Sequence, residues 1–353
     1  PGVTCHPGLN WPPGGAATGG GAGGLGARLA LLLGVARDAD GKRLAKPYVR
    51  RYGRYTSLQF SREQTQSRML TDEPDALLID YTRTMLAALL LRPDPARIGM
   101  VGLGGGSQVK FCHRYLPRAR IEVVENNPGV IALRRRFEIP DDDIRLEVSL
   151  DDGAAFVRAR PGRYDLLLVD GYDEAGIPQA LSTQKFYDDC RDALVPGCVM
   201  SVNLFSAAVD LHLELIRSSF GDRVAVLEEP KMSNQVAFAW TGDPLPPGPW
   251  DAGSVLATLP EPARRQLGPG FARLAQALDR RLQAQGRALD VLVQVNTSGE
   301  ASKFGLAPDQ APAFVRSLAA FPSLRVRGLM TLALFSSDAE RVRACFARLR
   351  ELR

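Results

Sequence analysis

The chain has 353 residues, enough for two domains or for one domain with appendages. Its formal charge of +5 is mild and comes almost wholly from dispersed arginines, which argues against a nucleic-acid-binding protein. The longest apolar stretch, residues 76–91, is interrupted by Asp80 and Arg83, so it indicates an amphipathic helix and not a membrane span.

The five cysteines are widely spaced and form no Cys-x-x-Cys pair, and the three histidines are scattered. These spacings argue against a metal site and favour a reducing, cytoplasmic compartment. The chain begins at Pro1 without a methionine and stops at Arg353 within a helical pattern, so we expect both ends to be incomplete.

Residues 1–45 are rich in glycine and proline and cannot bury enough apolar surface to offset their chain entropy, so we expect a disordered segment. Apolar and polar residues alternate over 48–69, which predicts a small hairpin or lid. Pro74 starts a predicted helix that runs to Leu91.

A strand–helix alternation follows over residues 98–240. The predicted strands are 98–103, 120–125, 144–148, 164–170, 199–204, 224–227 and 235–240, and the predicted helices are 107–116, 128–137, 152–160, 183–194 and 208–219. Such alternation predicts a parallel sheet covered on both faces, and the short spacing of the last two strands predicts an antiparallel hairpin at one edge. We therefore expect an α/β fold with a doubly wound, S-adenosylmethionine-methyltransferase-like Rossmann sheet.

A proline-rich stretch at 243–249 ends this domain, and helices are predicted at 254–265 and 270–286. A second strand–helix rhythm follows, with strands at 289–296 and 325–329 and helices at 310–320 and 339–353. We divide the chain into a Gly/Pro-rich segment (1–45), a main domain (46–250), a helical linker (251–285) and a partial β/α unit (286–353).

A glycine-rich loop joins the first core strand to its helix. Without a Cβ, such a loop lets a ligand approach the backbone at a helix N-terminus. The third glycine of a dinucleotide fingerprint is replaced by Ser107, so the loop alone is a weak signal. The candidate loop residues are Gly102, Gly104, Gly105 and Gly106.

Two acids at the ends of the next strands carry more information. Glu125 lies where a carboxylate would accept both ribose hydroxyls, and Asp152-Gly153 lies where an adenine amino group would be met. Adenosine held by two successive strand-end acids, without a pyrophosphate cradle, is the S-adenosylmethionine arrangement. In the alternative interpretation, Glu125 and Asp152 cap the helices that follow them.

Asp170 and Asp173 follow the fourth strand and are the candidate catalytic residues. One carboxylate could take a proton from an attacking amine while the other holds a positive charge of the substrate. The alternative is a solvated acidic loop.

Residues 48–240 resemble the spermidine synthase (polyamine aminopropyltransferase) family, especially its shorter bacterial branch. The resemblance is carried by residues 58–60, 66–69, 101–107, 123–128, 152–153, 164–173 and 186–187. In that family an aminopropyl group passes from decarboxylated S-adenosylmethionine to an amine. The resemblance implies ribose binding by Glu125, adenine binding by Asp152, Asp170 as base and Asp173 as amine anchor. It also implies substrate contacts by Gln59, Gln66 and Tyr172, and a possible homodimer.

Two departures from the family pattern bear on the amine. Gly105 stands where the family's loop has an aspartate that holds the donor's amino group. The run that lines the family's amine pocket reads Gln66-Ser67-Arg68, and an arginine is unfavourable beside a dication. A nucleoside-binding or methyl-transferring protein without polyamine synthase activity is therefore an alternative.

Residues 291–330 resemble a different family, the pyridoxal phosphate homeostasis proteins, which adopt an alanine-racemase-like (β/α)8 barrel. Residues 293–305 and 327–331 carry this resemblance. Two β/α units cannot close an eight-stranded barrel, and the family's cofactor lysine and phosphate site lie outside the matched part. We expect a partial barrel that binds no pyridoxal phosphate by itself, with Lys303 as a structural loop residue. A vitamin B6 handling module is the third functional hypothesis.

Overall fold

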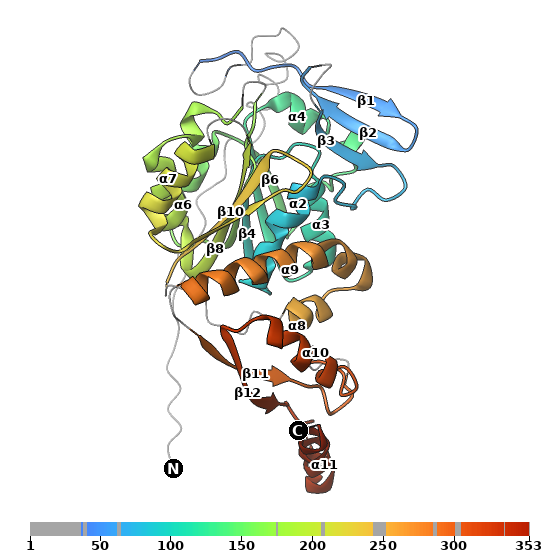
Figure 1. Cartoon of the computed structure of the whole chain (residues 1–353). Helices are drawn as coiled ribbons and strands as arrows, with labels where there is room; N and C mark the ends of the chain where they lie inside the picture. Colours follow the sequence, from blue (N-terminus) through green and yellow to red (C-terminus); the bar gives the residue numbers. More distant parts are fainter. Residues whose placement is uncertain are drawn as a thin grey trace, which may run out of the picture.

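The computed structural model describes residue 37 and residues 41–61, 65–173, 176–205, 209–242, 252–284, 288–300, 305–334 and 336–352. Within these residues, an antiparallel sheet of three strands precedes a seven-stranded central sheet, and a parallel pair of strands follows towards the C-terminus (Figure 1).

The first sheet occupies the stretch predicted as a hairpin or lid. Its strands are β1 (Tyr48–Tyr52), β2 (Tyr55–Gln59) and β3 (Thr65–Leu70), and the β2–β3 register shifts between Leu58 and Gln59. Most of the expected disordered segment lies outside the described residues. Residues 41–45 differ from that expectation, because Leu44 is half-buried and Asn127 Nδ2 donates to the Ala45 carbonyl oxygen (2.9 Å).

The central sheet has the strand order β6-β5-β4-β7-β8-β10-β9. Its strands are β4 (Arg97–Val101), β5 (Arg120–Glu125), β6 (Leu146–Leu150), β7 (Tyr164–Val169), β8 (Leu194–Phe205), β9 (Val224–Glu228) and β10 (Asn234–Trp240). The first five run parallel, and β10 is antiparallel to both β8 and β9. This arrangement confirms the doubly wound sheet with a hairpin at one edge.

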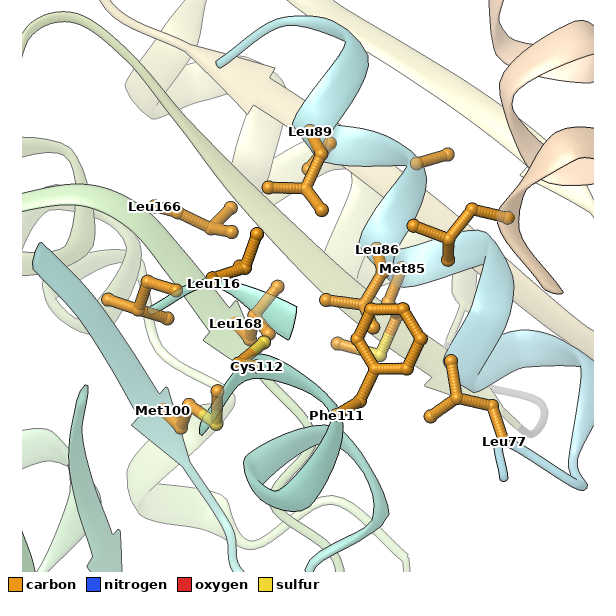
Figure 2. Close-up of a cluster of buried hydrophobic side chains, with 14 of the residues drawn as sticks. Leu77, Met85, Leu86, Leu89, Met100, Phe111, Cys112, Leu116, Leu166 and Leu168 are labelled. Atoms are coloured by element: carbon orange, nitrogen blue, oxygen red, sulfur yellow. The ribbon is translucent and has the colours of Figure 1, made fainter. Parts of the chain in front are cut away.

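Helices cover both faces of this sheet. Their bounds are α2 (Asp80–Met85), η1 (Leu86–Leu90), α3 (Ser107–Tyr115), α4 (Pro128–Ala132), η2 (Arg134–Phe137), α5 (Gly153–Arg158), η3 (Gln179–Leu181), α6 (Gln184–Ala193) and α7 (Val209–Phe220). Figure 2 shows one apolar layer, in which Leu86 lies beside Phe111 of α3; Leu89 and the strand residues Met100 and Leu168 belong to the same buried cluster. Every residue of β7 is buried, because this strand lies between the two helical layers.

The helix predicted to start at Pro74 begins only at Asp80. Ile79 is extended, with φ −95° and ψ 125°, and the Leu77 N–H donates to Gln266 Oε1 (2.7 Å). Because that N–H forms a hydrogen bond with a side chain distant in the sequence, residues 74–79 form an irregular segment before the helix.

Residues 251–285, expected as a linker, contain α8 (Ala252–Ala257) and α9 (Glu261–Ala284). We predicted a break between helices at 266–269, but α9 continues through Pro269. It packs against α2, η1 and β9. Its large apolar side chains that are fully buried and join the core of the main domain are Leu267, Phe271, Leu274 and Leu278.

The C-terminal unit consists of β11 (Leu289–Gln294), α10 (Ala311–Ser317), η4 (Leu318–Ala320), β12 (Leu324–Met330) and α11 (Ala339–Glu351). The strands β11 and β12 pair in parallel, as the second strand–helix rhythm predicted. In the described part of the chain, no helix combines the length and apolar character needed to cross a bilayer.

Candidate active site

A cavity of about 630 Å³ opens at the carboxyl edge of the central sheet. The loops that follow β4, β5, β6 and β7 form its floor, and residues of β3, α2 and the β8–β10 end form its walls. Carboxyl edges of parallel strands are where open α/β sheets bind ligands, because the strand-to-helix loops converge there.

The glycine loop lies directly on this floor. Gly102 has φ +96°, and a Cβ there would overlap the backbone carbonyl of Asp170. Gly106 has φ +66° and is the N-cap of α3. Gly104 and Gly105 also line the cavity, so all four predicted loop glycines are brought to the same place.

Glu125 holds the loops after β4 and β5 together. Its Oε2 accepts from Leu103 N (3.0 Å), and its Oε1 accepts from Asn127 N (2.8 Å). Burial raises the pKa of the Glu125 carboxyl, while the backbone N–H groups around it act in the opposite direction. The cap of α4 is Asn127, whose side chain accepts from Gly129 N, so Glu125 is not the helix cap of the alternative interpretation.

Asp152 combines a structural role with a place at the cavity. It is the N-cap of α5, and its Oδ1 accepts from Ala155 N (2.8 Å), as the alternative interpretation required. Asp152 and Gly153 nevertheless both line the cavity. A Cβ on Gly153 would lie 2.8 Å from Val101 Cγ1, so a glycine allows α5 to begin close to β4.

Asp170 lies where β7 ends, and its carboxylate is held by two neutral donors. Tyr81 Oη donates to Oδ2 (3.1 Å), and Asn203 Nδ2 donates to Oδ1 (2.8 Å). Asn234 Nδ2 donates in turn to Asn203 Oδ1 (2.8 Å). Burial raises the pKa of the Asp170 carboxyl, and the two hydrogen bonds partly oppose that rise.

Asp173 also lines the cavity, but its carboxylate is engaged differently. Its Oδ2 lies 2.7 Å from Lys42 Nζ, and its Oδ1 accepts from Gly176 N (3.0 Å). The Asp173 backbone N–H donates to the Gly176 carbonyl oxygen (2.9 Å), which closes the loop. Glu174, the next acid in the predicted acidic loop, lies outside the described residues.

The three predicted substrate contacts have different outcomes. Gln66 and Tyr172 line the cavity, and Tyr172 Oη donates to the Asn203 carbonyl oxygen (2.9 Å). Gln59 does not belong to the described lining, whereas its two chain neighbours, Leu58 and Phe60, do. Gln59 Nε2 donates to Thr65 Oγ1 (3.3 Å) within the first sheet.

Arg68 does not line the described cavity wall, although we had placed it in the amine pocket. Its side chain is exposed, and its guanidinium carbon lies 5.6 Å from the centroid of the Tyr55 ring. Side chains alternate along β3, so Ser67 and Met69 are buried while Arg68 between them is exposed. The electrostatic objection to an amine substrate at this position is therefore removed.

The charged side chains among the described residues that line the cavity are all negative. Four carboxylates contribute to it, and no lysine, arginine or histidine does; the acids are Glu125, Asp152, Asp170 and Asp173. The chain as a whole carries +5, so this anionic surface is local. Cationic ligands are favoured in such a cavity.

The sequence interpretation missed Tyr81, Asn203 and Asn234. Tyr81 lies in a stretch that we interpreted only as an amphipathic helix, Asn203 lies on a predicted strand, and Asn234 lies directly before one. A buried side-chain amide on a strand needs a hydrogen-bond partner, so an asparagine in an apolar strand was the one sequence signal that could have indicated these residues.

Two family models match different parts of the chain. The spermine/spermidine synthase domain matches residues 80–222, and the N-terminal domain of alanine racemase matches residues 269–353. The first match lies in the central sheet and its helices, while the second starts inside α9 and continues through α11. Both resemblances inferred from the sequence are confirmed.

Individual proteins show the same similarity. The polyamine aminopropyltransferase of Chromobacterium violaceum is 36% identical over 195 residues, which are 54% of this chain and 75% of the relative. That of Neisseria meningitidis serogroup B is 34% identical and covers 54% of this chain and 74% of the relative. The crystal structure of a probable spermidine synthase from Corynebacterium glutamicum has a TM-score of 0.49 at 18% identity, covering 82% of this chain and 95% of that chain. Because more than a third of the positions are identical across three quarters of the Chromobacterium relative, the chain belongs to the polyamine aminopropyltransferase family.

Proposed function

We propose that the chain transfers an aminopropyl group from decarboxylated S-adenosylmethionine to an amine, with Asp170 as the base. The observation that carries this proposal is the position of Asp170 in the anionic cavity, with its carboxylate held by Tyr81 and Asn203. A sulfonium donor and an amine acceptor are both cationic in water, and four carboxylates line the space that would receive them.

The reaction is a displacement at carbon. The acceptor nitrogen forms a bond to the propyl carbon attached to the sulfonium, and the carbon–sulfur bond breaks. Its electron pair moves to sulfur, which leaves as methylthioadenosine, and the proton of the attacking amine passes to Asp170. Because burial raises the pKa of Asp170, this carboxylate accepts a proton more readily than an exposed one.

The protein's main contribution is orientation of the two reactants. In this proposal Glu125 binds the ribose and Asp152 the adenine, as family resemblance suggests, while the glycine loop allows close approach of the donor. The support is that both acids and the loop line one cavity with Asp170. Tyr172 and Gln66 would contact the substrates from the walls.

One observation favours a second candidate, a nucleoside-binding or methyl-transferring protein on the same fold. A Cβ on Gly105 would lie 2.5 Å from Ser67 Oγ and 2.9 Å from Ser67 Cβ. An aspartate like that of the family's loop therefore does not fit unless Ser67 moves. The donor's amino group must be recognised by other residues, or a donor without this requirement is used.

The test is Asp170→Asn in the full chain. With decarboxylated S-adenosylmethionine and putrescine, we expect release of methylthioadenosine to fall by ~100-fold or more, since a positioned base contributes at least that factor. Affinity for methylthioadenosine, measured by calorimetry, should stay near that of the wild type because the adenosine contacts remain. Unchanged turnover would refute the base assignment.

The matched control is Asp192→Asn, which removes an exposed carboxylate that pairs with Arg191 outside the described cavity lining. Its turnover and nucleoside affinity should equal those of the wild type. If the wild type binds methylthioadenosine but transfers no aminopropyl group to any amine tested, the second candidate replaces the first. A homodimer and a cytoplasmic location stay predictions.

A further inference from the structure

A lysine side chain reaches the edge of the cavity from the N-terminal segment. Lys42 Nζ lies 2.7 Å from Asp173 Oδ2. The backbone that follows is fixed at two points, since Ala45 accepts from Asn127 Nδ2 (2.9 Å) and Pro47 packs on Gly129. Leu44 and Ala45, which lie between Lys42 and Pro47 in the chain, line the cavity. Lys42 is therefore presented to Asp173 by a segment attached to the site.

The Asp173 carboxylate is consequently satisfied from within the chain. Lys42 engages Oδ2, and the Gly176 N–H engages Oδ1 (3.0 Å). The Asp173 side chain is 18% exposed and that of Lys42 is 43% exposed, so the pair lies at the border between cavity and solvent. An aspartate expected to anchor a substrate amine already has an ammonium group beside it.

Asp170 differs from Asp173 in the nature of its partners. The hydroxyl of Tyr81 and the amide of Asn203 are neutral donors, so they orient the carboxylate without cancelling its charge. The cavity thus has an uncompensated acid where the amine would react, and a compensated acid three residues later in the chain.

We propose that Lys42 determines acceptor specificity by filling the position of a second substrate ammonium group at Asp173. This inference rests on the proposed function. The favoured acceptors would carry a single amino group, which lies at Asp170. The other end of the molecule, near Lys42, would be uncharged. A diamine would bring a second positive charge next to Lys42, and that like-charge contact is unfavourable.

The test compares the full-length wild type with Lys42→Met, which keeps a long unbranched side chain without charge, and with Lys42→Arg as the charge-conserving control. The probes are 1,4-diaminobutane and n-butylamine, which share a four-carbon chain and differ by one ammonium group. Binding of each amine is measured by calorimetry in the presence of saturating methylthioadenosine, and binding of methylthioadenosine alone is measured separately.

In Lys42→Met we expect diamine affinity to rise by about fivefold relative to butylamine, the size of effect typical of one partly exposed charge pair. Lys42→Arg should keep the wild-type ratio of the two affinities, and methylthioadenosine affinity should be equal in all three proteins. Transfer to each amine should follow the same order.

An equal change in both amines, or weaker diamine binding, would overturn the proposal, because Lys42 would then hold the loop without selecting the acceptor. Failure of both amines to bind any variant that still binds methylthioadenosine would also overturn it, while leaving the donor half of the proposed function intact. Loss of methylthioadenosine binding in the wild type itself would refute the proposed function and this inference with it.

Discussion

The surroundings of Asp170 set the pH range in which it can act as a base. Burial raises the pKa of its carboxyl, and the hydrogen bonds from Asn203 and Tyr81 lower it again because they stabilise the charged form. The Tyr81 hydroxyl is itself kept protonated, since burial and the Asp170 charge raise its pKa well above the usual value. Tyr81 and Asn203 are therefore positioning residues for Asp170.

Replacing Tyr81 with Phe tests this arrangement. The substitution removes a donor to the carboxylate, so the pKa of Asp170 should rise and the acidic limb of the turnover–pH profile should move to higher pH. On the alkaline plateau, where Asp170 is deprotonated in both proteins, turnover should fall by less than ~10-fold, since a neutral hydrogen bond contributes about 1 kcal/mol.

Tyr48→Phe is the matched control, because Tyr48 is an exposed residue of β1. Its profile should coincide with that of the wild type. A Tyr81→Phe profile with an unmoved acidic limb, or one displaced towards lower pH, would mean that Tyr81 does not influence the base.

For single residues, the sequence predicted the site correctly where a residue's place at the end of a strand determines its position in the cavity. Glu125, Asp152 and Asp170 follow predicted strands, and parallel strands bring their carboxyl ends to one edge. Tyr81 and Asn203 reach Asp170 from elements far away in the chain, and no local pattern indicates such contacts. Arg68 was misplaced because residues 66–68 were treated as one lining segment, whereas alternation along β3 buries Ser67 and Met69 and exposes Arg68 between them.

Among the elements, α9 shows how tertiary packing overrides a local signal. Gly268-Pro269-Gly270 predicts a helix break, yet α9 is continuous through it. Gly270 lies against α2, and a Cβ there would lie in ordinary van der Waals contact, 3.4 Å from the Arg83 carbonyl oxygen. Arg273 adds an ion pair with the buried Glu229 (3.2 Å). Such contacts between distant segments are not visible in a local pattern.

This packing predicts where the main domain ends. A chain that stops at residue 250 loses α9, and with it four large buried apolar side chains that each contribute about 2–5 kcal/mol. That loss is comparable to the whole stability of a typical domain, about 5–15 kcal/mol, so this chain should not fold cooperatively. A chain that stops at residue 284 keeps α9 and should unfold cooperatively.

Urea unfolding followed by circular dichroism compares the two chains, and methylthioadenosine affinity gives a second measurement. Phe271→Ala in the full chain should lower the free energy of unfolding by about 3–5 kcal/mol. Gln276→Ala, at an exposed position of the same helix, should change it little. Equal unfolding curves for the chains ending at 250 and 284 would show that α9 is dispensable.

The whole molecule joins a complete doubly wound sheet to part of a second fold. Figure 1 draws the C-terminal unit beyond α9, away from the first sheet. The two parts are connected through Ser323, whose N–H donates to Asp279 Oδ1 (3.3 Å) and whose Oγ donates to the Asp279 carbonyl oxygen (3.2 Å). The residues of the candidate active site lie between Lys42 and Asn234, so the C-terminal unit contributes none of its described lining.

This division predicts that the chain retains no pyridoxal phosphate. The β11–β12 pair is far from the eight strands that close a barrel, and apolar side chains such as Leu292 (46% exposed) and Phe346 (52% exposed) lack the cover that a complete barrel would give. After incubation with pyridoxal phosphate, borohydride reduction and gel filtration, the absorbance of the protein should match that of an untreated sample, and methylthioadenosine affinity should be unchanged. Lys303→Ala is the comparison variant, although Lys303 lies outside the described residues. A label that the wild type retains and Lys303→Ala loses would contradict the prediction and favour a vitamin B6 handling role for the C-terminal unit.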